Sequence, residues 1–324
     1  MKKILYITGG SAKAGFGHAM RSWELFNQTR GESSINFISI VPERELLRRI
    51  EFSDYCLPLE KFDVEKLPDN IDMVVTDLPL AYFDEYVSLI FKHFRHKKIV
   101  SLDIYQAQYG KPDKAINLKL TTESESLFSS YPCKHYWGLD YAIIRKGFFR
   151  YRDYKFTLNK KQVLISIGGA DFKGYTDKIL EKLRSTDKNS NNVEYSVILG
   201  PWNRSRIGKK ESNSFKLYRS PKNIEEIMAR SSLSICNGGT TLLECCYLGI
   251  PAIVMPQTEE EKIFFQSFAK RGVGKIMDID DPSFTTFVMN ILKDDGYLST
   301  QRRISKELVD GKGIERIKKI ILND

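Results

Sequence analysis

Residues 8–21 hold the side chains best suited to chemistry in the first half of the chain. Glycines at positions 9, 10, 15 and 17 are followed by His18 and, three residues later, by Arg21. The apolar run Ile4–Ile7 before them predicts a buried strand, and residues 18–28 predict a helix. A strand, a glycine-rich loop and a helix start form an anion cradle, because free helix N–H groups face the ligand. His18 would then be a neutral imidazole that accepts a proton; the alternative is a tight turn followed by a surface histidine.

A second strand, glycine turn and helix start lie at residues 235–244. The turn contains Gly238 and Gly239, and Thr240 and Thr241 begin the expected helix. Backbone N–H groups and the two hydroxyls could bind a diphosphate there. Glu244, one helical turn further on, could accept both hydroxyls of a ribose. The alternative is an exposed helix glutamate that the N-terminal helix dipole stabilises.

Two aspartates end apolar runs in the first half of the chain. Asp77 follows residues 71–76, and Asp103 follows residues 98–102. Because ligands of parallel sheets bind at the carboxyl ends of the strands, we expect both side chains to border a ligand cleft. Each could instead cap a helix or a turn.

The composition indicates a globular protein with an acidic partner. A length of 324 residues suggests roughly two domains. The net charge of +9 favours a nucleotide, a nucleic acid or an anionic membrane surface. Because the basic residues are spread out, without a stripe of interleaved aromatic side chains, we expect a small-molecule partner and no nucleic acid.

The chain is expected to be cytoplasmic. No apolar run reaches the ~18 residues that a transmembrane helix needs, and the N-terminus lacks the apolar core and cleavage site of a signal peptide. The five cysteines are an odd number without metal-ligand spacing, which indicates reduced thiols.

Strand-like and helix-like segments alternate along the chain, which predicts an α/β protein with two Rossmann-like domains facing a cleft. We expect the first domain at residues 1–150 and the second at residues 151–324, with the basic aromatic passage 146–161 as a linker. The last expected helices, 301–308 and 313–322, could pack back on the first domain, although the sequence does not show this. Further expected strands are 35–41, 71–76, 98–102, 162–167, 195–199, 215–218, 233–236, 252–255 and 275–279. Expected helices are 43–50, 81–94, 175–183, 224–229, 240–248, 262–270, 301–308 and 313–322.

Four motifs occur in an order that resembles one enzyme family. They are Gly15-Phe-Gly17-His18-x-x-Arg21, Ser166-Ile-Gly168-Gly169-Ala-Asp171, Gly238-Gly239-x-x-x-x-Glu244 and Asp310-Gly-Lys-Gly-Ile-Glu-Arg316. Together they resemble the UDP-sugar hydrolases of pseudaminic acid biosynthesis and the related spore-coat polysaccharide proteins. Residues 136–145 and the pattern Asp113-x-x-x-Asn117 also match that family.

The resemblance implies the glycosyltransferase-B (GT-B) fold, which the lipid-II-forming N-acetylglucosaminyltransferase shares. It places UDP in the C-terminal domain and the sugar in the N-terminal domain. The family reaction releases UDP from a UDP-linked diacetamido-trideoxy-altrose without a metal or cofactor. A water activated by the histidine that matches His18 attacks the anomeric carbon with inversion. A diphosphate is a good leaving group, so such a reaction needs one base and donors for the developing phosphate charge.

The same resemblance, together with the patterns above, gives the candidate site. Sugar-side candidates are Gly15, Gly17, Arg21, Asp77, Asp103, Asn117, Tyr141, Glu260 and Glu261. Nucleotide-side candidates are Gly168, Gly169, Asp171, Gly238, Gly239, Thr240, Thr241 and Glu244.

The chain departs from the family at Glu260 and Glu261, where the family has an Asn-Gln pair. Amides can donate to a sugar or a phosphate, whereas carboxylates only accept and repel a diphosphate. We therefore expect either a sugar that presents hydroxyl or amino donors toward these glutamates, or a takeover of the contacts by Gln257 and Gln266.

The sequence leaves the sugar, the base of the nucleotide and the oligomeric state open, and it is compatible with three functions. An inverting glycosyltransferase would use the same base on an acceptor hydroxyl, and it could contact a membrane surface peripherally. A non-catalytic nucleotide-sugar binding protein would use the same cleft without a reaction. A hydrolase is favoured, because the Gly-Phe-Gly-His-x-x-Arg form is closer to the hydrolases than to the lipid-II enzyme.

Overall fold

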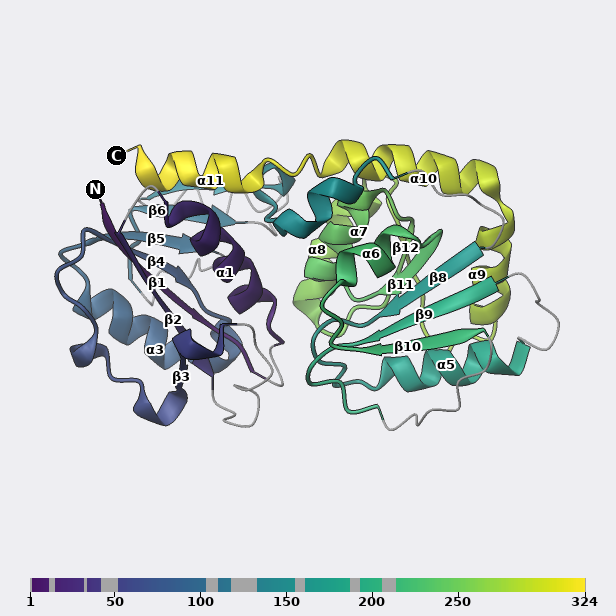
Figure 1. The fold of residues 1–324 in the computed structure, drawn as a ribbon, viewed down its shortest axis with the longest axis horizontal. Helices are drawn as coiled ribbons and strands as arrows, with labels where there is room; N and C mark the ends of the chain where they lie inside the picture. Colours follow the sequence, from purple (N-terminus) through teal and green to yellow (C-terminus); the bar gives the residue numbers. More distant parts are fainter. Residues whose placement is uncertain are drawn as a thin grey trace. The chain divides into compact units, whose positions relative to one another are not determined.

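The chain folds as two α/β units. The computed structural model describes residues 2–11, 15–31, 34–41, 52–102, 110–117, 133–154, 161–186, 193–205 and 214–323 (Figure 1). The first unit comprises residues 1–145 and 311–324, and the second comprises residues 146–310. Among the described residues, no helix is both long and apolar enough to cross a bilayer.

The first unit is built on a parallel sheet, whose described strands follow the order β3-β2-β1-β4-β5-β6-β7. The strands are β1 (Lys3–Gly9), β2 (Ser34–Val41), β3 (Cys56–Pro58), β4 (Met73–Asp77), β5 (Lys98–Leu102), β6 (Lys114–Asn117) and β7 (Lys134–Trp137). The helices are α1 (Gly17–Thr29), α3 (Leu80–His93) and α11 (Gly313–Leu322), and short 3-10 turns include η1 (Ser53–Tyr55), η2 (Leu59–Lys61), η3 (Val64–Lys66) and η6 (Leu139–Tyr141). The expected helix at 43–50 lies outside the described residues.

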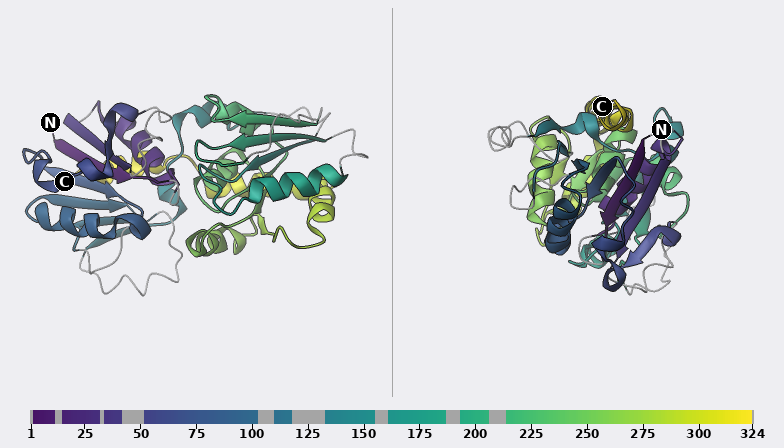
Figure 2. Two further views of the ribbon diagram at one scale, coloured as in Figure 1. Left: turned by 90° about the horizontal axis from the view of Figure 1, so that it is seen from below. Right: turned by 90° about the vertical axis from the view of Figure 1, so that its left-hand side faces the viewer.

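Helices cover both faces of this sheet (Figure 2). Leu5 and Val74 are buried against α3, whose Phe83 is fully buried in the same cluster. On the opposite face Tyr6 contacts Phe26 of α1 edge-to-face, with ring centroids 6.1 Å apart. Because neighbouring residues of a strand point to opposite faces, a continuous apolar β1 supports both layers.

The last helix, α11, belongs to the first unit, whereas the expected boundary placed it in the second. A Cβ at Gly313 would lie 2.1 Å from Ala142 O, so only glycine lets the helix start against residues 139–142. Arg316 donates to Asp140 O at 2.8 Å in the same contact. Two of the segments that carry the family resemblance, 136–145 and 310–316, are therefore in contact with each other, and this contact has a structural role.

Two lysines hold the other end of α11. Lys114, which is 8% exposed, donates to Ile320 O at 2.7 Å, and Lys2 donates to Leu322 O at 2.9 Å. The last carbonyls of a helix lack hydrogen-bond partners within the helix, and cations at its C-terminus also interact favourably with the negative end of the helix dipole. These bonds fix the chain end to β6 and to the residue before β1.

The second unit repeats the architecture with the described strand order β10-β9-β8-β11-β12-β13, again parallel. The strands are β8 (Lys161–Ser166), β9 (Val193–Leu199), β10 (Phe215–Arg219), β11 (Leu233–Cys236), β12 (Ala252–Val254) and β13 (Lys275–Ile276). The helices are α5 (Tyr175–Thr186), α6 (Ile224–Ala229), α7 (Thr240–Leu248), α8 (Glu259–Ala269), α9 (Phe284–Lys293) and α10 (Asp295–Leu308), and η7 (Lys146–Tyr151) opens the unit.

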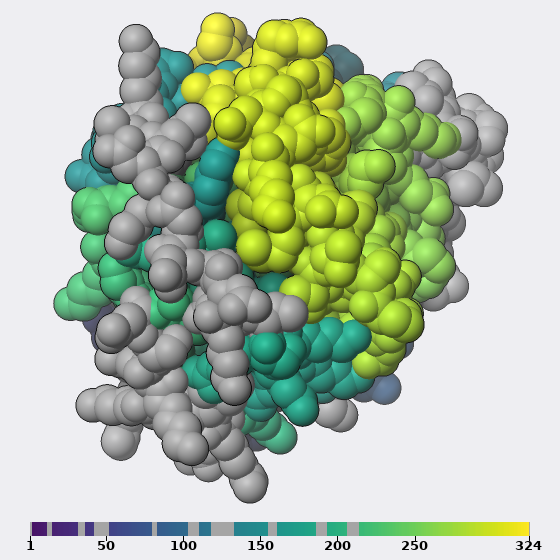
Figure 3. Space-filling view, turned by 90° about the vertical axis from the view of Figure 1, so that its right-hand side faces the viewer, coloured from purple at the N-terminus to yellow at the C-terminus, as the bar shows by residue number. Residues whose placement is uncertain are grey.

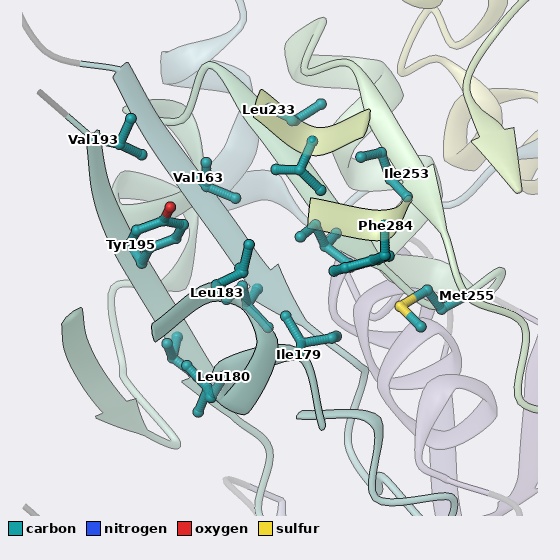
Figure 4. Close-up of a cluster of buried hydrophobic side chains, with 14 of the residues drawn as sticks. Val163, Ile179, Leu180, Leu183, Val193, Tyr195, Leu233, Ile253, Met255 and Phe284 are labelled. Carbon is teal, nitrogen blue, oxygen red and sulfur yellow. The ribbon is translucent and has the colours of Figure 1, made fainter. Parts of the chain in front are cut away.

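One side of the second sheet forms an apolar core with α5 and α9. Figure 4 shows Val163 and Tyr195 of the sheet, Ile179 and Leu183 of α5, and Phe284 of α9 in one cluster. The space-filling view of this unit shows α9 and α10 in yellow-green and yellow, and α5 in teal beneath them (Figure 3). Burial of these side chains supplies the main favourable term for folding of the unit.

The expected linker at 146–161 begins as an integral part of the second unit. Phe148 is 1% exposed. Arg152 donates to Lys306 O and Val309 O, each at 2.9 Å, and its guanidinium lies 4.5 Å from the Tyr247 ring centroid. This anchoring explains why the boundary falls at residue 145 and not at residue 150.

Both sheets reverse their strand order at a defined point. In the first sheet the reversal lies between β1 and β4: β2 and β3 follow on the β1 side, and β5, β6 and β7 follow on the β4 side. In the second sheet it lies between β8 and β11. Ligands of such sheets bind outside the carboxyl ends of the strands at the reversal. A ligand site is therefore expected at the segments that follow β1 and β4 in the first unit and β8 and β11 in the second.

Candidate functional site

Asp77, at the end of β4, is the centre of a buried hydrogen-bond network in the first unit. Its side chain is 1% exposed. Arg21 of α1 donates through Nε to Oδ2 at 2.7 Å and through Nη2 to Oδ1 at 2.5 Å. Ser22 Oγ donates to Oδ2 at 2.8 Å, and His18 Nδ1 lies 2.7 Å from Oδ1. Parallel pairing of Thr8 with Asp77 brings the end of β4 beside the loop that leads into α1.

The charges around Asp77 keep it ionised. Burial alone would raise the pKa of its carboxyl, but the charge of Arg21, the charge that His18 carries when protonated, and the hydrogen bonds from both residues outweigh burial and hold that pKa below its usual range. A carboxylate only accepts hydrogen bonds, so the 2.7 Å contact with Asp77 favours a proton on Nδ1 of His18 over the longer, 3.0 Å contact in which Arg21 Nη2 would donate to that nitrogen. A proton taken from a water or a substrate must then go to Nε2, as in catalytic His–Asp pairs.

The loop before α1 requires glycine at two positions. Gly15 has φ +76°, and its backbone exchanges hydrogen bonds with Ser11 in both directions, at 2.9 and 3.2 Å. A Cβ at Gly10 would lie 2.8 Å from the Phe16 ring. Gly17 is the first residue of α1, and His18, with 16% side-chain exposure, is the second. The loop thus ends where the free N–H groups of α1 begin.

The remaining sugar-side candidates of the first unit lie in different settings. Arg21 is 6% exposed and, like Asp77, is committed to the network around His18, so both side chains position the histidine. Asn117 is 4% exposed at the end of β6. Tyr141 is half-buried in η6, and burial, followed by the nearby Tyr136 and Asp140, raises the pKa of its hydroxyl. Asp103 lies outside the described residues.

In the second unit the turn after β8 packs tightly against its neighbours. Gly168 has φ +72°, and a Cβ there would lie 3.2 Å from Asn237 Nδ2. A Cβ at Gly200, after β9, would lie 2.5 Å from the backbone of Gly168 and Gly169. Asp171 accepts from Tyr175 N at 2.9 Å and from Thr176 N at 2.6 Å. It therefore caps the start of α5, as a helix-capping aspartate does.

The turn after β11 leads directly into α7. Gly239 occupies the N-cap position and Thr240 begins the helix, so no side chain of the N-cap residue covers the first N–H groups. Thr240 and Thr241 are both half-buried. Glu244 is 3% exposed, so it is not the surface glutamate that the sequence left as an alternative.

Glu260 and Glu261 have different positions although they are neighbours in α8. Glu260 is exposed. Glu261 points back onto the β11 turn, where its carboxylate accepts from Asn237 Nδ2 at 2.5 Å, Gln257 N at 2.8 Å and Gly238 N at 3.3 Å. The two glutamates therefore do not act as a pair.

The side chain of Gln257 is buried and makes hydrogen bonds within the protein. It is 5% exposed, and its amide donates to Ala170 O at 2.9 Å and accepts from Phe172 N at 3.1 Å. These bonds join the loop after β12 to the turn after β8. Gln266 is exposed on α8.

Sequence reasoning missed two residues of these sites. Ser22 follows Arg21 and completes the network around Asp77, but a serine inside a helix carries no distinctive signal. Asn237 precedes the glycine pair at the end of β11, and that position at the carboxyl end of an expected strand is the signal that could have identified it.

Comparisons with known proteins agree with this architecture. Residues 160–294 match the glycosyltransferase family 28 C-terminal domain. An uncharacterized protein of Methanocaldococcus jannaschii is 27% identical over 292 residues, which cover 83% of this chain and 58% of that protein. The spore coat polysaccharide biosynthesis protein SpsG of Bacillus subtilis is 27% identical over 196 residues, 57% of each protein. The chain thus spans less than two thirds of the length of both relatives.

Solved structures of low sequence identity show the fold. MurG of Acinetobacter baumannii superimposes with a TM-score of 0.64 at 12% identity, over 100% of both chains. The UDP-GlcNAc 2-epimerase of Neisseria meningitidis, in a structure bound to UDP-GlcNAc, gives a TM-score of 0.65 at 15% identity, over 99% of this chain and 100% of that one. The chain therefore has a GT-B fold, its residues 160–294 match the glycosyltransferase family 28 C-terminal domain, and its sequence is similar to that of the spore coat polysaccharide biosynthesis protein SpsG.

Proposed function

We propose that this GT-B enzyme hydrolyses a UDP-linked sugar. The first unit presents His18 as the general base, and the second unit holds the nucleotide. Water, activated by His18, attacks the anomeric carbon with inversion, the anomeric carbon–oxygen bond breaks, and UDP leaves with the bonding electrons. The proton of the water passes to Nε2 of His18. Diacetamido-trideoxy sugars and related sugars of surface-glycan biosynthesis are the substrates that the family resemblance suggests.

The observation that carries this proposal is the His18–Asp77 pair. Asp77, ionised and held by Arg21 and Ser22, fixes the Nδ1–H tautomer of His18. A histidine oriented in this way is suited to general-base catalysis, which contributes roughly 10²–10⁴-fold to a rate. A binding protein would have no need for an oriented base, so the pair favours an enzyme over the non-catalytic alternative.

The turns after β8 and β11 support a nucleotide site in the second unit. They lie at the strand-order reversal, α7 starts there without a side-chain cap, and Glu244 is buried one turn into that helix. The structural relatives with this fold include one bound to UDP-GlcNAc and one with UDP. Helix N-termini at such reversals are a recurrent place for phosphate groups.

If Glu244 binds the ribose, the Glu244→Ala variant should bind UDP more weakly. The expected loss is about 1.5–3 kcal/mol, the value of a hydrogen bond to a charged group. Calorimetric titration with UDP measures it, and Glu260→Ala, a change at an exposed residue of the same unit, is the control. Equal UDP affinity of Glu244→Ala and the wild type would place the ribose elsewhere.

Release of UDP from candidate UDP-sugars tests the proposed reaction. We expect release in buffer alone, at a rate that added acceptor sugars do not raise. Release only in the presence of an acceptor would identify an inverting glycosyltransferase, the second candidate, since a base like His18 can also deprotonate a hydroxyl. Tight binding of the UDP-sugar without release under either condition would identify a binding protein.

A further inference from the structure

The turn that the sequence assigns to a diphosphate already holds an anion, the carboxylate of Glu261. Oε2 accepts from Gly238 N at 3.3 Å and Gln257 N at 2.8 Å, and Oε1 accepts from Asn237 Nδ2 at 2.5 Å. A Cβ at Gly239 would lie 3.3 Å from Oε1, so the carboxylate also reaches the N-cap of α7. One negative group thus lies against the turn from Asn237 to Gly239.

We propose that Glu261 is an intramolecular competitor for the phosphate-binding turn. Its carboxylate occupies the turn in the nucleotide-free protein and must move away when the diphosphate of a nucleotide sugar binds. This inference rests on the proposed nucleotide site in the second unit. It assigns Glu261 a role in phosphate affinity, and it does not require the ligand to offer donors to the carboxylate.

Two physical arguments support displacement over a permanent contact. The N–H of Gly238 cannot serve a carboxylate and a phosphate at full strength together, and like charges in contact repel strongly where water is partly excluded. In addition, Asn237 is 7% exposed, and its Oδ1 has no hydrogen-bond partner within the described part of the chain. A buried acceptor without a partner is costly, so the observed arrangement does not satisfy the turn completely.

Position and reach also allow Glu261 to move. It lies in the first turn of α8, where the backbone is held independently by Thr258, whose Oγ1 accepts from Glu261 N at 3.2 Å. The side chain is half-buried, so it can rotate toward solvent without unfolding the helix. By returning to the turn, the carboxylate would lower the affinity for the product UDP and promote its release, a step that often limits turnover.

The test compares the affinities for uridine and UDP, because the ratio isolates the contribution of the phosphates. Calorimetric titration would use the wild type, Glu261→Gln and, as the matched control, Glu260→Gln, which removes the same charge from the exposed neighbour. We expect the ratio of uridine Kd to UDP Kd to rise at least tenfold in Glu261→Gln and to stay unchanged in Glu260→Gln. In Glu261→Gln the Asn237 amide can rotate so that Oδ1 accepts from the new amide, so the turn is retained.

A second variant guards against a folding defect in the first. Glu261→Asp keeps the charge but withdraws it by one methylene, and we expect its ratio to lie between those of the wild type and Glu261→Gln. If the ratio of uridine Kd to UDP Kd were unchanged or lower in both variants, the proposal would be overturned. The nucleotide site would still stand in that case, because uridine and UDP would still bind. Failure of all these proteins to bind either ligand would instead remove the nucleotide site, and this inference with it.

Discussion

Replacing His18 with alanine is expected to lower turnover by roughly two to four powers of ten, since that is the usual contribution of a general base. The affinity for UDP should remain nearly unchanged, because His18 belongs to the first unit and the proposed nucleotide contacts belong to the second. Steady-state rates of UDP release and titration with UDP measure the two quantities separately. A fall in kcat and kcat/KM together would indicate a contact made only in the transition state.

His18→Gln is a useful companion variant, since glutamine can still accept a hydrogen bond but cannot take up a proton. We expect it to be as slow as His18→Ala. Full turnover in either variant would remove His18 from the mechanism. A small, uniform loss of binding in both would mark the histidine as structural.

The Asp77→Asn variant should lose both activity and stability. An asparagine can turn its NH₂ group toward Nδ1 of His18, which favours the tautomer with the proton on Nε2 and so removes the base. We expect turnover to fall by about 10²–10⁴-fold. The change also leaves Arg21, 6% exposed, without its anionic partner, which should cost roughly 3–5 kcal/mol of unfolding free energy.

The stability difference should depend on pH in a defined direction. Because the folded state holds the pKa of Asp77 below its usual value, this carboxyl stabilises the protein at pH values above about 4 and loses that effect as the pH falls further. Denaturant unfolding of the wild type and Asp77→Asn should show a gap in unfolding free energy that shrinks as the pH falls below about 4.

Ser22→Ala is the matched control, because Ser22 donates to Asp77 Oδ2, whereas His18 lies against the other oxygen, Oδ1. It should lower stability by only about 1 kcal/mol, the net value of one hydrogen bond, and leave turnover near the wild-type level. If Ser22→Ala slowed turnover as much as Asp77→Asn, the effect would come from general disturbance of the network and not from the tautomer of His18.

Much of the fold could be predicted from hydrophobic pattern alone. The strands at 98–102 and 233–236 and the helices at 224–229, 240–248 and 313–322 match the structure at both ends. These segments are bounded by polar, charged or glycine residues, and buried parallel strands give continuous apolar runs. The prediction of two Rossmann-like domains with a GT-B fold is confirmed.

The elements that were missed have physical reasons. Strands β6 and β7 are short and carry Lys114, His135 and other polar residues, so they lack a strand pattern. Helix α9 shows apolar residues at helical spacing from Phe284 onward, a pattern that is typical of a helix. The return of α11 to the first unit depends on the close approach of Gly313 to Ala142, which sequence spacing cannot reveal.

The candidate site was partly accessible to sequence reasoning. Residue types at the carboxyl ends of strands identified His18 and Asp77 separately, because that edge of a parallel sheet collects ligand-binding residues. Their direct contact, and the contact of Glu261 with the β11 turn, depend on side-chain directions that only the folded chain fixes. The roles of these residues in binding and catalysis stay predictions.

Hydrolysis of a UDP-sugar in oxygen-18-labelled water tests the central claim most directly, because the position of the label identifies the bond that breaks. The measurement is mass analysis of both products, the released sugar and UDP, after a single turnover without an acceptor. The account predicts one labelled oxygen in the released sugar, at the anomeric carbon, and none in UDP. Label in the β-phosphate of UDP would show attack at phosphorus, and it would contradict the assignment of His18 as the base for water at the anomeric carbon.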